Sequence, residues 1–270
     1  EIAVISSMRT YVRKGFLEAT GVQLASFVAL AAFFVGLLGC GGAIESQVDE
    51  DSEGHPLVGE IVEVRSAEGV MKVAHEDIPD FMPAMTMDFE VREGDLKTFK
   101  PGMKIRARLV RGEEGEFILK KIWPLGDGKA EKAIRAATEE QAARMDELGS
   151  GRYLGPGDDA PNLVLVDQFG EVIDVSALKG KYVMLNFIFT RCSDANMCPL
   201  STSKMARMQR LAKEGGIDNL FFVSVTMDPL YDTPGVLREY ADLYSIDGSN
   251  FKFATGPKSA VNGLFKALAV

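Results

Sequence analysis

The chain has 270 residues, of which 46% are hydrophobic and 26% are charged, and its formal net charge is -9 at pH 7. This length is enough for two ordinary domains, and the composition is that of a globular protein. The negative charge argues against nucleic acid as a partner, because a phosphate-binding protein needs a basic face.

The N-terminal segment has the organisation of an export signal. It contains the only cationic cluster, which consists of Arg9, Arg13 and Lys14. A long apolar run, Leu24–Gly42, follows this cluster. Its uninterrupted part is shorter than the roughly 20 residues that a membrane-spanning helix needs, and it is closer to the apolar core of a signal peptide.

The end of the apolar run predicts how the protein is held at a membrane. Residues 37–40, "LLGC", resemble the bacterial lipobox, which is cleaved before its cysteine and lipidated on the thiol. We therefore predict that residues 1–42 are a signal and lipid-anchor region, with Cys40 as the lipidation site. The alternative is a single transmembrane anchor with an incidental cysteine. Either anchor leaves the rest of the chain on the periplasmic or extracytoplasmic side of the membrane.

A small all-β domain is expected next in the chain. Residues 43–56 are acidic and poor in apolar side chains, so they read as a flexible tether. Between residues 57 and 125, short runs of alternating apolar and polar residues are separated by glycines, which is typical of strands and turns. The runs are 57–66, 69–75, 85–91, 103–112 and 116–123. Five short strands in so few residues predict a small closed barrel.

Soft metal-binding side chains gather in the middle of this domain. Met85 and Met87 are two residues apart, so on a strand they share one face. His75 ends the preceding predicted strand, and Met82 lies in the intervening loop. Thioethers and an imidazole together suit Cu(I) or Ag(I). The alternative is that these methionines only fill the barrel core.

This stretch resembles the CusF-like family of periplasmic copper-binding domains, which are five-stranded barrels of the OB type. In that family the ligands are a histidine and the two methionines of an "MTM" arrangement, and His75, Met85 and Met87 match them. The family's metal-facing tryptophan is replaced by Met82, which the resemblance makes a candidate third sulfur ligand. Trp123, the only tryptophan, is expected to pack in the core at the end of the last strand.

A helical spacer and then an α/β domain are expected to follow the barrel. Residues 126–155 are rich in strong helix formers with a thin apolar stripe and end in a glycine-rich hinge. From residue 156, apolar strand runs alternate with helical runs, which implies parallel strand pairing. The predicted elements are two short strands around the "DQFG" turn at 167–170, strands at 181–189, 220–227 and 251–255, and helices at 199–216 and 232–244.

The cysteine pair lies at one end of this predicted sheet. Cys192 is in the loop after the first buried strand, and Cys198 is placed at the N-cap of the next helix, with five residues between the two. Functional groups collect at the carboxyl ends of such strands. We expect the helix dipole to stabilise a thiolate at Cys198, which could act as a nucleophile or as a soft metal ligand.

The oxidation state of this pair is open at the level of sequence. If Cys40 carries lipid, Cys192 and Cys198 are the only other thiols, and an oxidising compartment would tend to join them as a disulfide. A purely structural disulfide is the alternative, but it would close a short loop and add little stability.

Three stretches of this domain together resemble the Sco/SenC family. They are "FIFTRC" with the following "CP", the "DQFG" hairpin, and "VSVTMDPLYDTPGVLREYA". The family comprises thioredoxin-like, membrane-tethered copper proteins that help to assemble the binuclear copper site of cytochrome c oxidase. The resemblance covers the chain from about Gly155 to Val270, and it implies that Cys192 and Cys198 bind copper together with a distant histidine.

The chain departs from the family pattern in two respects. The family usually has three residues between the cysteines, whereas this chain has five. The only histidines, His55 and His75, lie upstream, so the third ligand is expected beyond Val270 in a longer chain. Asp228 matches a family aspartate, and we expect it to brace the turn before Pro229 rather than to act in the site.

We therefore predict a multidomain protein with an OB-like barrel (57–125) followed by a thioredoxin-like α/β domain (156–270). The predicted function is that of a membrane-tethered copper chaperone, which binds Cu(I), or alternatively Cu(II), and delivers it to the copper-bearing subunit of cytochrome c oxidase. Two alternatives stay open. The protein could be a thiol–disulfide oxidoreductase that uses Cys192 and Cys198 as a redox pair with a thiol reductant. It could also be a copper buffer or resistance protein.

Overall fold

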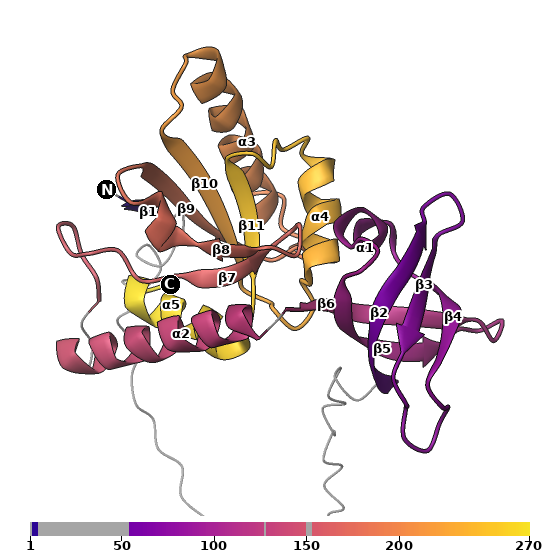
Figure 1. Ribbon diagram of the computed structural model, residues 1–270. Helices are drawn as coiled ribbons and strands as arrows, with labels where there is room; N and C mark the ends of the chain where they lie inside the picture. The colour runs from indigo at the N-terminus through magenta and orange to yellow at the C-terminus, as the bar shows by residue number, and fades with distance from the viewer. Residues whose placement is uncertain (1, 5–53, 127, 150–152) are drawn as a thin grey trace, which may run out of the picture. The chain divides into compact units, whose positions relative to one another are not determined.

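The computed structural model describes residues 2–4, 54–126, 128–149 and 153–270 (Figure 1). The predicted lipidation site Cys40 and most of the predicted signal and tether lie outside these residues. The end of the predicted tether is described, and its residues His55 and Pro56 belong to the first barrel strand rather than to a tether. A short strand that the sequence did not predict, β1 (Ile2–Val4), is also described, and its backbone pairs in parallel with β9 (Tyr182–Ile188). Within the described ranges, no helix is long and apolar enough to span a membrane.

The prediction of a closed barrel is confirmed, with the strands in the order β2-β3-β4-β6-β5. The bounds are β2 (His55–Arg65), β3 (Val70–His75), β4 (Met85–Glu90), β5 (Lys104–Arg111) and β6 (Phe117–Leu125). Alternate residues of each strand point inward and form one apolar core, which includes Leu57, Ile61, Met71, Val73, Phe89, Ile105 and Leu119. The alternation of apolar and polar residues in the sequence is thus the alternation between barrel interior and solvent.

Two details of the barrel differ from the prediction. A short helix, α1 (Glu93–Thr98), connects β4 to β5; it is too short to produce a recognisable helical period in the sequence. Trp123 was expected in the core, but it is only half-buried, and the guanidinium carbon of Arg106 lies 5.5 Å from its ring centroid. The neighbouring residue on β6, Ile122, is buried in the core instead.

The second folded part is the predicted α/β domain. Its sheet has the order β1-β9-β10-β11-β7-β8, with β9, β10 and β11 in parallel and β7 antiparallel to β11 (Figure 1). The strands are β7 (Val164–Asp167), β8 (Val172–Asp174), β9, β10 (Leu220–Thr226) and β11 (Phe251–Thr255). The helices are α2 (Lys129–Leu148), the 3-10 helix η1 (Val175–Leu178), α3 (Cys198–Glu214), α4 (Pro234–Leu243) and α5 (Lys258–Leu268).

Helices cover both faces of this sheet, which explains why its strands are apolar without interruption. On one face, Val261 and Leu264 of α5 pack on Leu185 and Val225 of the central strands. On the other face, the core joins α3 and α4 to Phe222 and the other side chains on that side of the sheet. A central strand therefore buries every side chain in turn on one core or the other.

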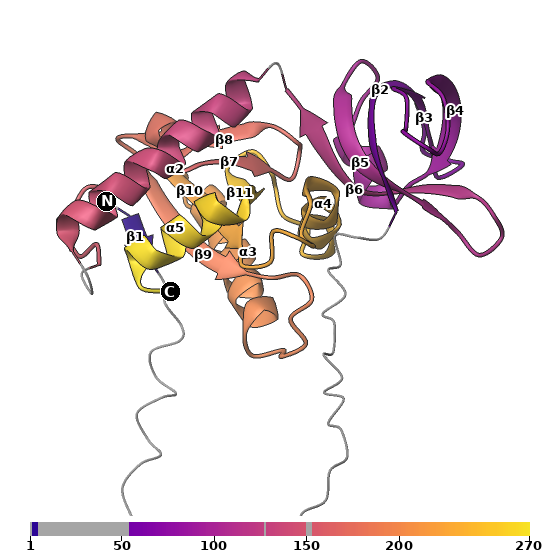
Figure 2. The ribbon, with the colours of Figure 1, turned by 90° about the horizontal axis from the view of Figure 1, so that it is seen from below.

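Helix α2, which the sequence suggested as a spacer, is a packed element of this domain. Ile134 and Ala137 form a small core with Val164 and Val166 of β7. The helix lies beside α5 on the same side of the sheet (Figure 2). Its narrow apolar stripe is thus the face that the sheet covers.

Helix α1 of the barrel packs on α4 of the α/β domain, within one compact unit. Polar contacts join the two parts: the Gly94 N–H donates to Glu239 Oε1 (2.9 Å), Lys97 Nζ pairs with Asp242 Oδ2 (2.8 Å), and the Thr98 hydroxyl donates to the carbonyl of Gln168 (3.1 Å). A Cβ on Gly94 would overlap the carbonyl oxygen of Gly235. The helices approach this closely because both positions lack a side chain.

Candidate metal sites

The predicted ligands of the barrel meet on one face of the hairpin formed by β3 and β4. His75 lies directly opposite Met85, and Val73 lies opposite Met87. Opposed residues of an antiparallel pair have Cβ atoms about 5 Å apart, and a diagonal neighbour is still within reach of a long side chain. His75 therefore has Met85 beside it and Met87 on the diagonal.

The imidazole of His75 is held with one nitrogen unused. The side chain is only 4% exposed, and its Nδ1 lies 2.8 Å from the carbonyl oxygen of Glu76. A carbonyl can only accept, so Nδ1 carries the proton and Nε2 keeps its lone pair in the neutral ring. No described residue offers Nε2 a hydrogen-bond partner, although the atom is buried. A buried acceptor without a partner costs free energy, and binding a metal ion would remove that cost.

The three methionines of the candidate site differ in how far they are exposed. Along β4, exposure rises from buried Phe89 through half-buried Met87 to Met85, which is 46% exposed. Met82 lies in the loop between β3 and β4, packs against the barrel core, and is held by backbone hydrogen bonds to Ile78. The ligand set thus runs from the edge of the core to the rim of the barrel.

Gly59 of β2 makes room on the other side of His75. The two residues are paired in the sheet. A Cβ at Gly59 would lie 2.9 Å from the His75 Cα and 2.7 Å from the carbonyl oxygen of Ala74. Any larger residue would therefore push β3 away and displace the imidazole.

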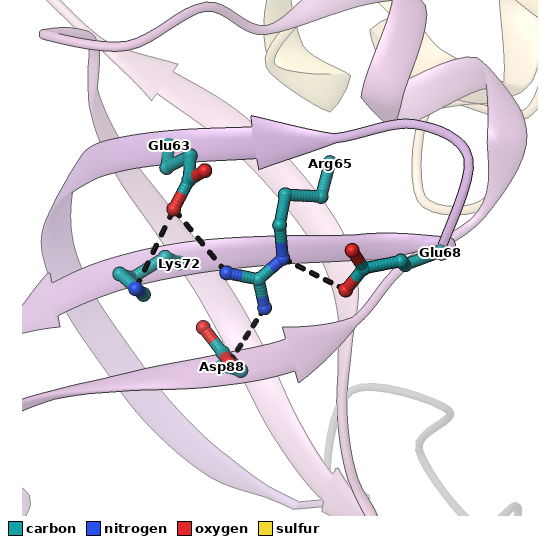
Figure 3. Close-up of polar contacts among 5 residues, drawn as sticks. All are labelled: Glu63, Arg65, Glu68, Lys72 and Asp88. Atoms are coloured by element: carbon teal, nitrogen blue, oxygen red, sulfur yellow. Dashed lines mark hydrogen bonds and ion pairs between the residues drawn. The ribbon is translucent and has the colours of Figure 1, made fainter.

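A network of ion pairs on the outer face braces the same strands (Figure 3). Arg65 at the end of β2 reaches across β3 to Asp88 of β4 (2.6 Å), and hydrogen bonding to Asp88 raises the pKa of the guanidinium. The remaining pairs are Arg65–Glu68 (2.9 Å), Arg65–Glu63 (3.2 Å) and Lys72–Glu63 (3.4 Å). Asp88 lies between Met87 and Phe89 in the sequence but points to the opposite face, so the network supports the ligand strands from outside.

The cysteine pair lies where the predicted sheet placed it, at the carboxyl end of β9. Helix α3 begins at Cys198 itself and its N-cap is Met197, one residue earlier than expected. The five intervening residues do not hold the cysteines apart. Two turns fold the loop, with Cys192 N–H donating to the Phe189 carbonyl (3.2 Å) and Met197 N–H to the Asp194 carbonyl (3.1 Å). Cys192 then packs against the core cluster that contains Cys198.

The structure favours a protonated thiol at Cys198, not the thiolate that the sequence led us to expect. Burial raises the pKa of this thiol to about 11; the Cys192 thiol beside it raises the pKa further, while the backbone of Phe189 lowers it. Desolvation of this side chain, which is 4% exposed, thus outweighs the backbone hydrogen bonds that favour the thiolate. Both cysteines are free thiols in the part of the chain described, and the predicted disulfide is not formed. A metal ion that takes Cys198 as a thiolate must therefore displace a proton.

Polar residues that the sequence did not single out hold the cysteine loop. The Asp228 side chain braces this loop, because its Oδ2 pairs with Arg191 (2.7 Å), the residue before Cys192. Its backbone carbonyl also holds its own turn, since it accepts hydrogen bonds from the N–H groups of Tyr231 and Asp232. Asp232 is fully buried and accepts hydrogen bonds from Thr190, and Thr226 joins the same carboxylate. Two aspartates in the "DPLYD" stretch before a predicted helix were a sign in the sequence that polar groups gather there. The stretch does not show which residues these aspartates bind.

Other predicted ligands are not brought together. Among the residues that the structure describes, no group of three or more histidine, cysteine, aspartate or glutamate side chains is arranged to hold a metal ion. Both histidines belong to the barrel; His55 is exposed and stacks on Phe81, with ring centroids 4.0 Å apart. The third ligand that the family resemblance implies for the cysteine pair therefore stays a prediction.

A sheet with parallel central strands, a cysteine after one of them and a second cysteine opening the next helix defines a thioredoxin-like domain, joined here to a small barrel. Comparison with known proteins confirms both family resemblances. Residues 156–270 match the family SCO1/SenC, and residues 54–124 match the family of the copper binding periplasmic protein CusF. The α/β domain is thus similar to the SCO1/SenC family, and the barrel is similar to CusF.

Individual relatives match shorter segments. The chain is 41% identical over 76 residues to a SCO2-like protein of Rickettsia felis, covering 28% of this chain and 36% of the relative. It is 33% identical over 90 residues to the SCO1 protein homolog of Bacillus subtilis, covering 33% of this chain and 45% of the relative. The crystal structure of a SCO1/SenC family lipoprotein from Bacillus anthracis aligns with a TM-score of 0.38 at 31% identity, over 41% of this chain and 65% of that one. The chain thus spans less than half the length of these two curated relatives.

Proposed function

We propose that the protein is an extracytoplasmic copper chaperone with two copper-binding sites. One site is the rim of the barrel, with His75, Met85, Met87 and Met82 as ligands. The other is the cysteine pair, Cys192 and Cys198, completed by the histidine that the family implies. The cargo is copper, and Cu(I) suits thioether and thiolate ligands best.

The observation that carries this proposal is the unpartnered Nε2 of His75. A buried imidazole that serves only the fold normally uses both nitrogens. Here Nδ1 is satisfied by a backbone carbonyl, as is usual for metal-bound histidines, and the free nitrogen belongs to a residue with a thioether directly opposite it. The same arrangement has no evident use in a barrel whose methionines only fill space.

Delivery is proposed from the family relationships. Sco-type proteins help to assemble the copper site of cytochrome c oxidase, so the recipient proposed here is the copper-bearing subunit of that enzyme. Residues 1–42 would carry a signal and a lipid on Cys40, which would hold the two domains at the outer side of a membrane. The tether at 43–56 would then let the domains reach a membrane-bound recipient.

Anaerobic titration of the full chain with Cu(I) against a competing chelator tests both sites. We expect two equivalents to bind. Met85→Leu with Met87→Leu should remove one equivalent, and Cys192→Ser with Cys198→Ser should remove the other. Met103→Leu is the matched control, because Met103 also packs on the barrel core and its sulfur only accepts a local N–H. A stoichiometry unchanged by both double substitutions would reject the two sites.

Delivery needs a separate measurement. The Cu(I)-loaded chain is mixed anaerobically with the metal-free soluble domain of the oxidase subunit, the two proteins are separated, and the copper content of each is measured. Transfer of copper to the recipient supports a chaperone. Copper that stays on the chain at equilibrium would instead indicate a buffer or resistance protein.

A thiol–disulfide oxidoreductase is the second candidate, and the proximity of two free thiols of unequal exposure favours it. Cys192 is partly exposed and could attack a client disulfide, after which buried Cys198 would resolve the mixed disulfide. The raised pKa of Cys198 argues against this residue as the attacking thiolate. Turnover of a model disulfide by the metal-free protein, together with negligible copper affinity, would select this candidate.

A further inference from the structure

We propose that Asp232 is a positioning residue, which sets the distance between the two cysteine thiols by holding the loop that carries Cys192. This inference rests on the proposed role of Cys192 and Cys198 as a binding site. It adds Asp232 as a residue outside the cysteine pair that controls the spacing of the two thiols. The evidence is a buried hydrogen-bond network between the ends of two neighbouring parallel strands.

The network is centred on the carboxylate of Asp232, which is 0% exposed. The backbone N–H of Thr190 donates to its Oδ2 (3.1 Å), and the Thr190 hydroxyl donates to Oδ1 (2.5 Å). The hydroxyl of Thr226 also donates to Oδ2 (2.5 Å). One buried side chain thus fixes both the backbone and the side chain of Thr190, two residues before Cys192.

The second anchor of the network is the end of β10. Thr226 is the last residue of that strand, and its hydroxyl oxygen accepts the N–H of Asp228 (2.9 Å). Strand β10 pairs with β9 along its whole length, and Thr226 lies opposite Ile188, the last residue of β9. Asp232 therefore ties the cysteine loop to the carboxyl end of β10, a central strand of the sheet.

The surroundings of Asp232 suit a structural role. Burial raises the pKa of its carboxyl group, and the hydrogen bonds from Thr190 and Thr226 oppose this rise only in part. Three donors satisfy the carboxylate. A buried carboxyl group with such partners is costly to disturb, so it restricts the loop to one conformation.

This restriction has a consequence for the cysteines. Cys198 is fixed because it opens α3 and is buried in the core beneath that helix. The position of Cys192 depends on the loop. If the loop loses its tie, Cys192 samples more positions, and its effective concentration near Cys198 falls. A bridging metal ion and an intramolecular disulfide would both become less favourable.

The test measures this effective concentration in the metal-free full chain. The protein is equilibrated with mixtures of reduced and oxidised glutathione. Closure oxidises the two protein thiols to one disulfide and reduces one oxidised glutathione to two thiols, so the equilibrium constant reports how well the pair is positioned. Because copper is absent, the result does not depend on whether the chain binds copper.

Four variants make the test specific. Asp232→Asn and Thr190→Val each remove part of the network, and we expect the constant to fall about tenfold, the effect of one buried hydrogen bond. In Thr190→Ser the hydroxyl is kept, so the equilibrium constant for disulfide closure should stay within about twofold of the wild-type value. Thr98→Val is the matched control, because the hydroxyl of buried Thr98 donates one hydrogen bond to the Gln168 carbonyl, which is not part of the Asp232 network.

Urea unfolding of each reduced variant shows that it is folded under the assay conditions. If Asp232→Asn does not fold, the comparison of Thr190→Val with Thr190→Ser decides. The proposal is overturned if the constant is unchanged in the folded network variants, if Thr98→Val lowers it equally, or if the wild-type pair does not close.

Discussion

Single atoms decide the chemistry of both candidate sites. In the barrel, a backbone carbonyl fixes the tautomer of His75 and leaves Nε2 free; in the α/β domain, burial keeps the Cys198 thiol protonated. Neither property belongs to the residue type. Each follows from what the fold places around the side chain, and each leaves a group that metal binding would satisfy or deprotonate.

The unused nitrogen predicts that function and stability are opposed at His75. In His75→Leu, no hydrogen bond of Nε2 is lost, and a buried polar atom without a partner is removed. We expect the free energy of unfolding to be unchanged or to rise, within about 1 kcal/mol, because only the local bond to the Glu76 carbonyl disappears. Affinity of the barrel site for Cu(I) should fall at least about tenfold.

Urea unfolding and chelator competition measure the two quantities. His55→Leu is the control, since this exposed imidazole only stacks on Phe81 and its loss should leave copper affinity unchanged. A loss of stability well above 1 kcal/mol in His75→Leu would show instead that the imidazole serves the fold.

At the scale of elements, glycines decide which helices and strands can touch. Gly59 lets β2 approach His75, and Gly94 lets α1 approach Gly235 of α4. The contact between α1 and α4 links the barrel to the α/β domain. It is therefore sensitive to the smallest possible side chain.

Gly94→Ala should weaken this contact. The new methyl group would overlap the carbonyl oxygen of Gly235, and backbone atoms cannot move aside as a flexible side chain can. We expect the free energy of unfolding to fall by about 1–3 kcal/mol, as is usual for overpacking. Gly263→Ala in α5 is the matched control, because no atom lies within 4 Å of its Cβ position. It should be neutral or stabilising by up to about 1 kcal/mol. Equal effects in urea unfolding would show that α1 and α4 do not depend on their glycines.

Helices and strands with a clear hydrophobic periodicity were predictable from the sequence, whereas features without such a pattern were missed. The barrel strands, α2 and the central strands of the α/β sheet were predicted from apolar patterns within a residue or two of their bounds. Helix α1 was missed because six residues contain less than two turns. The ties of Asp232 to Thr190 were missed because they join separate loops, whose meeting depends on how the sheet is assembled. The side chains of the candidate sites could be named, but their burial and free lone pairs could not.

At the scale of the whole molecule, a buried carboxyl group lies where the two domains meet. Asp95 of α1 is 2% exposed, packs against Gly235 of α4, and its Oδ1 has no hydrogen-bond partner among the described residues. Burial raises the pKa of this carboxyl to about 8; Arg92 lowers the pKa and Glu239 raises it. The folded protein therefore holds a proton that the unfolded chain releases at much lower pH.

The stability of the protein should consequently fall as pH rises. Below the unfolded pKa of about 4, both states are protonated and the contribution of Asp95 is fully present. Between pH 4 and about 8, only the folded state keeps the proton, so the free energy of unfolding falls by about 1.4 kcal/mol per pH unit; above the folded pKa it falls no further. Asp95→Asn should remove this slope and be the more stable protein at pH 8.

Urea unfolding between pH 5 and pH 8 checks this prediction. Glu93→Gln is the control, because Glu93 belongs to the same helix but is exposed, and its loss should leave the slope in place. An identical pH dependence in wild type and Asp95→Asn would assign the slope to other groups.

The gradient of exposure along β4 has a consequence for the speed of handover. A metal ion bound between buried His75 and exposed Met85 would keep one side open to an incoming sulfur donor. A sulfur donor of the recipient could then bind the ion before the ligands of the barrel dissociate. The rate of copper transfer would then rise with the concentration of the recipient. A copper ion enclosed in the core would instead dissociate at a rate that does not depend on the recipient.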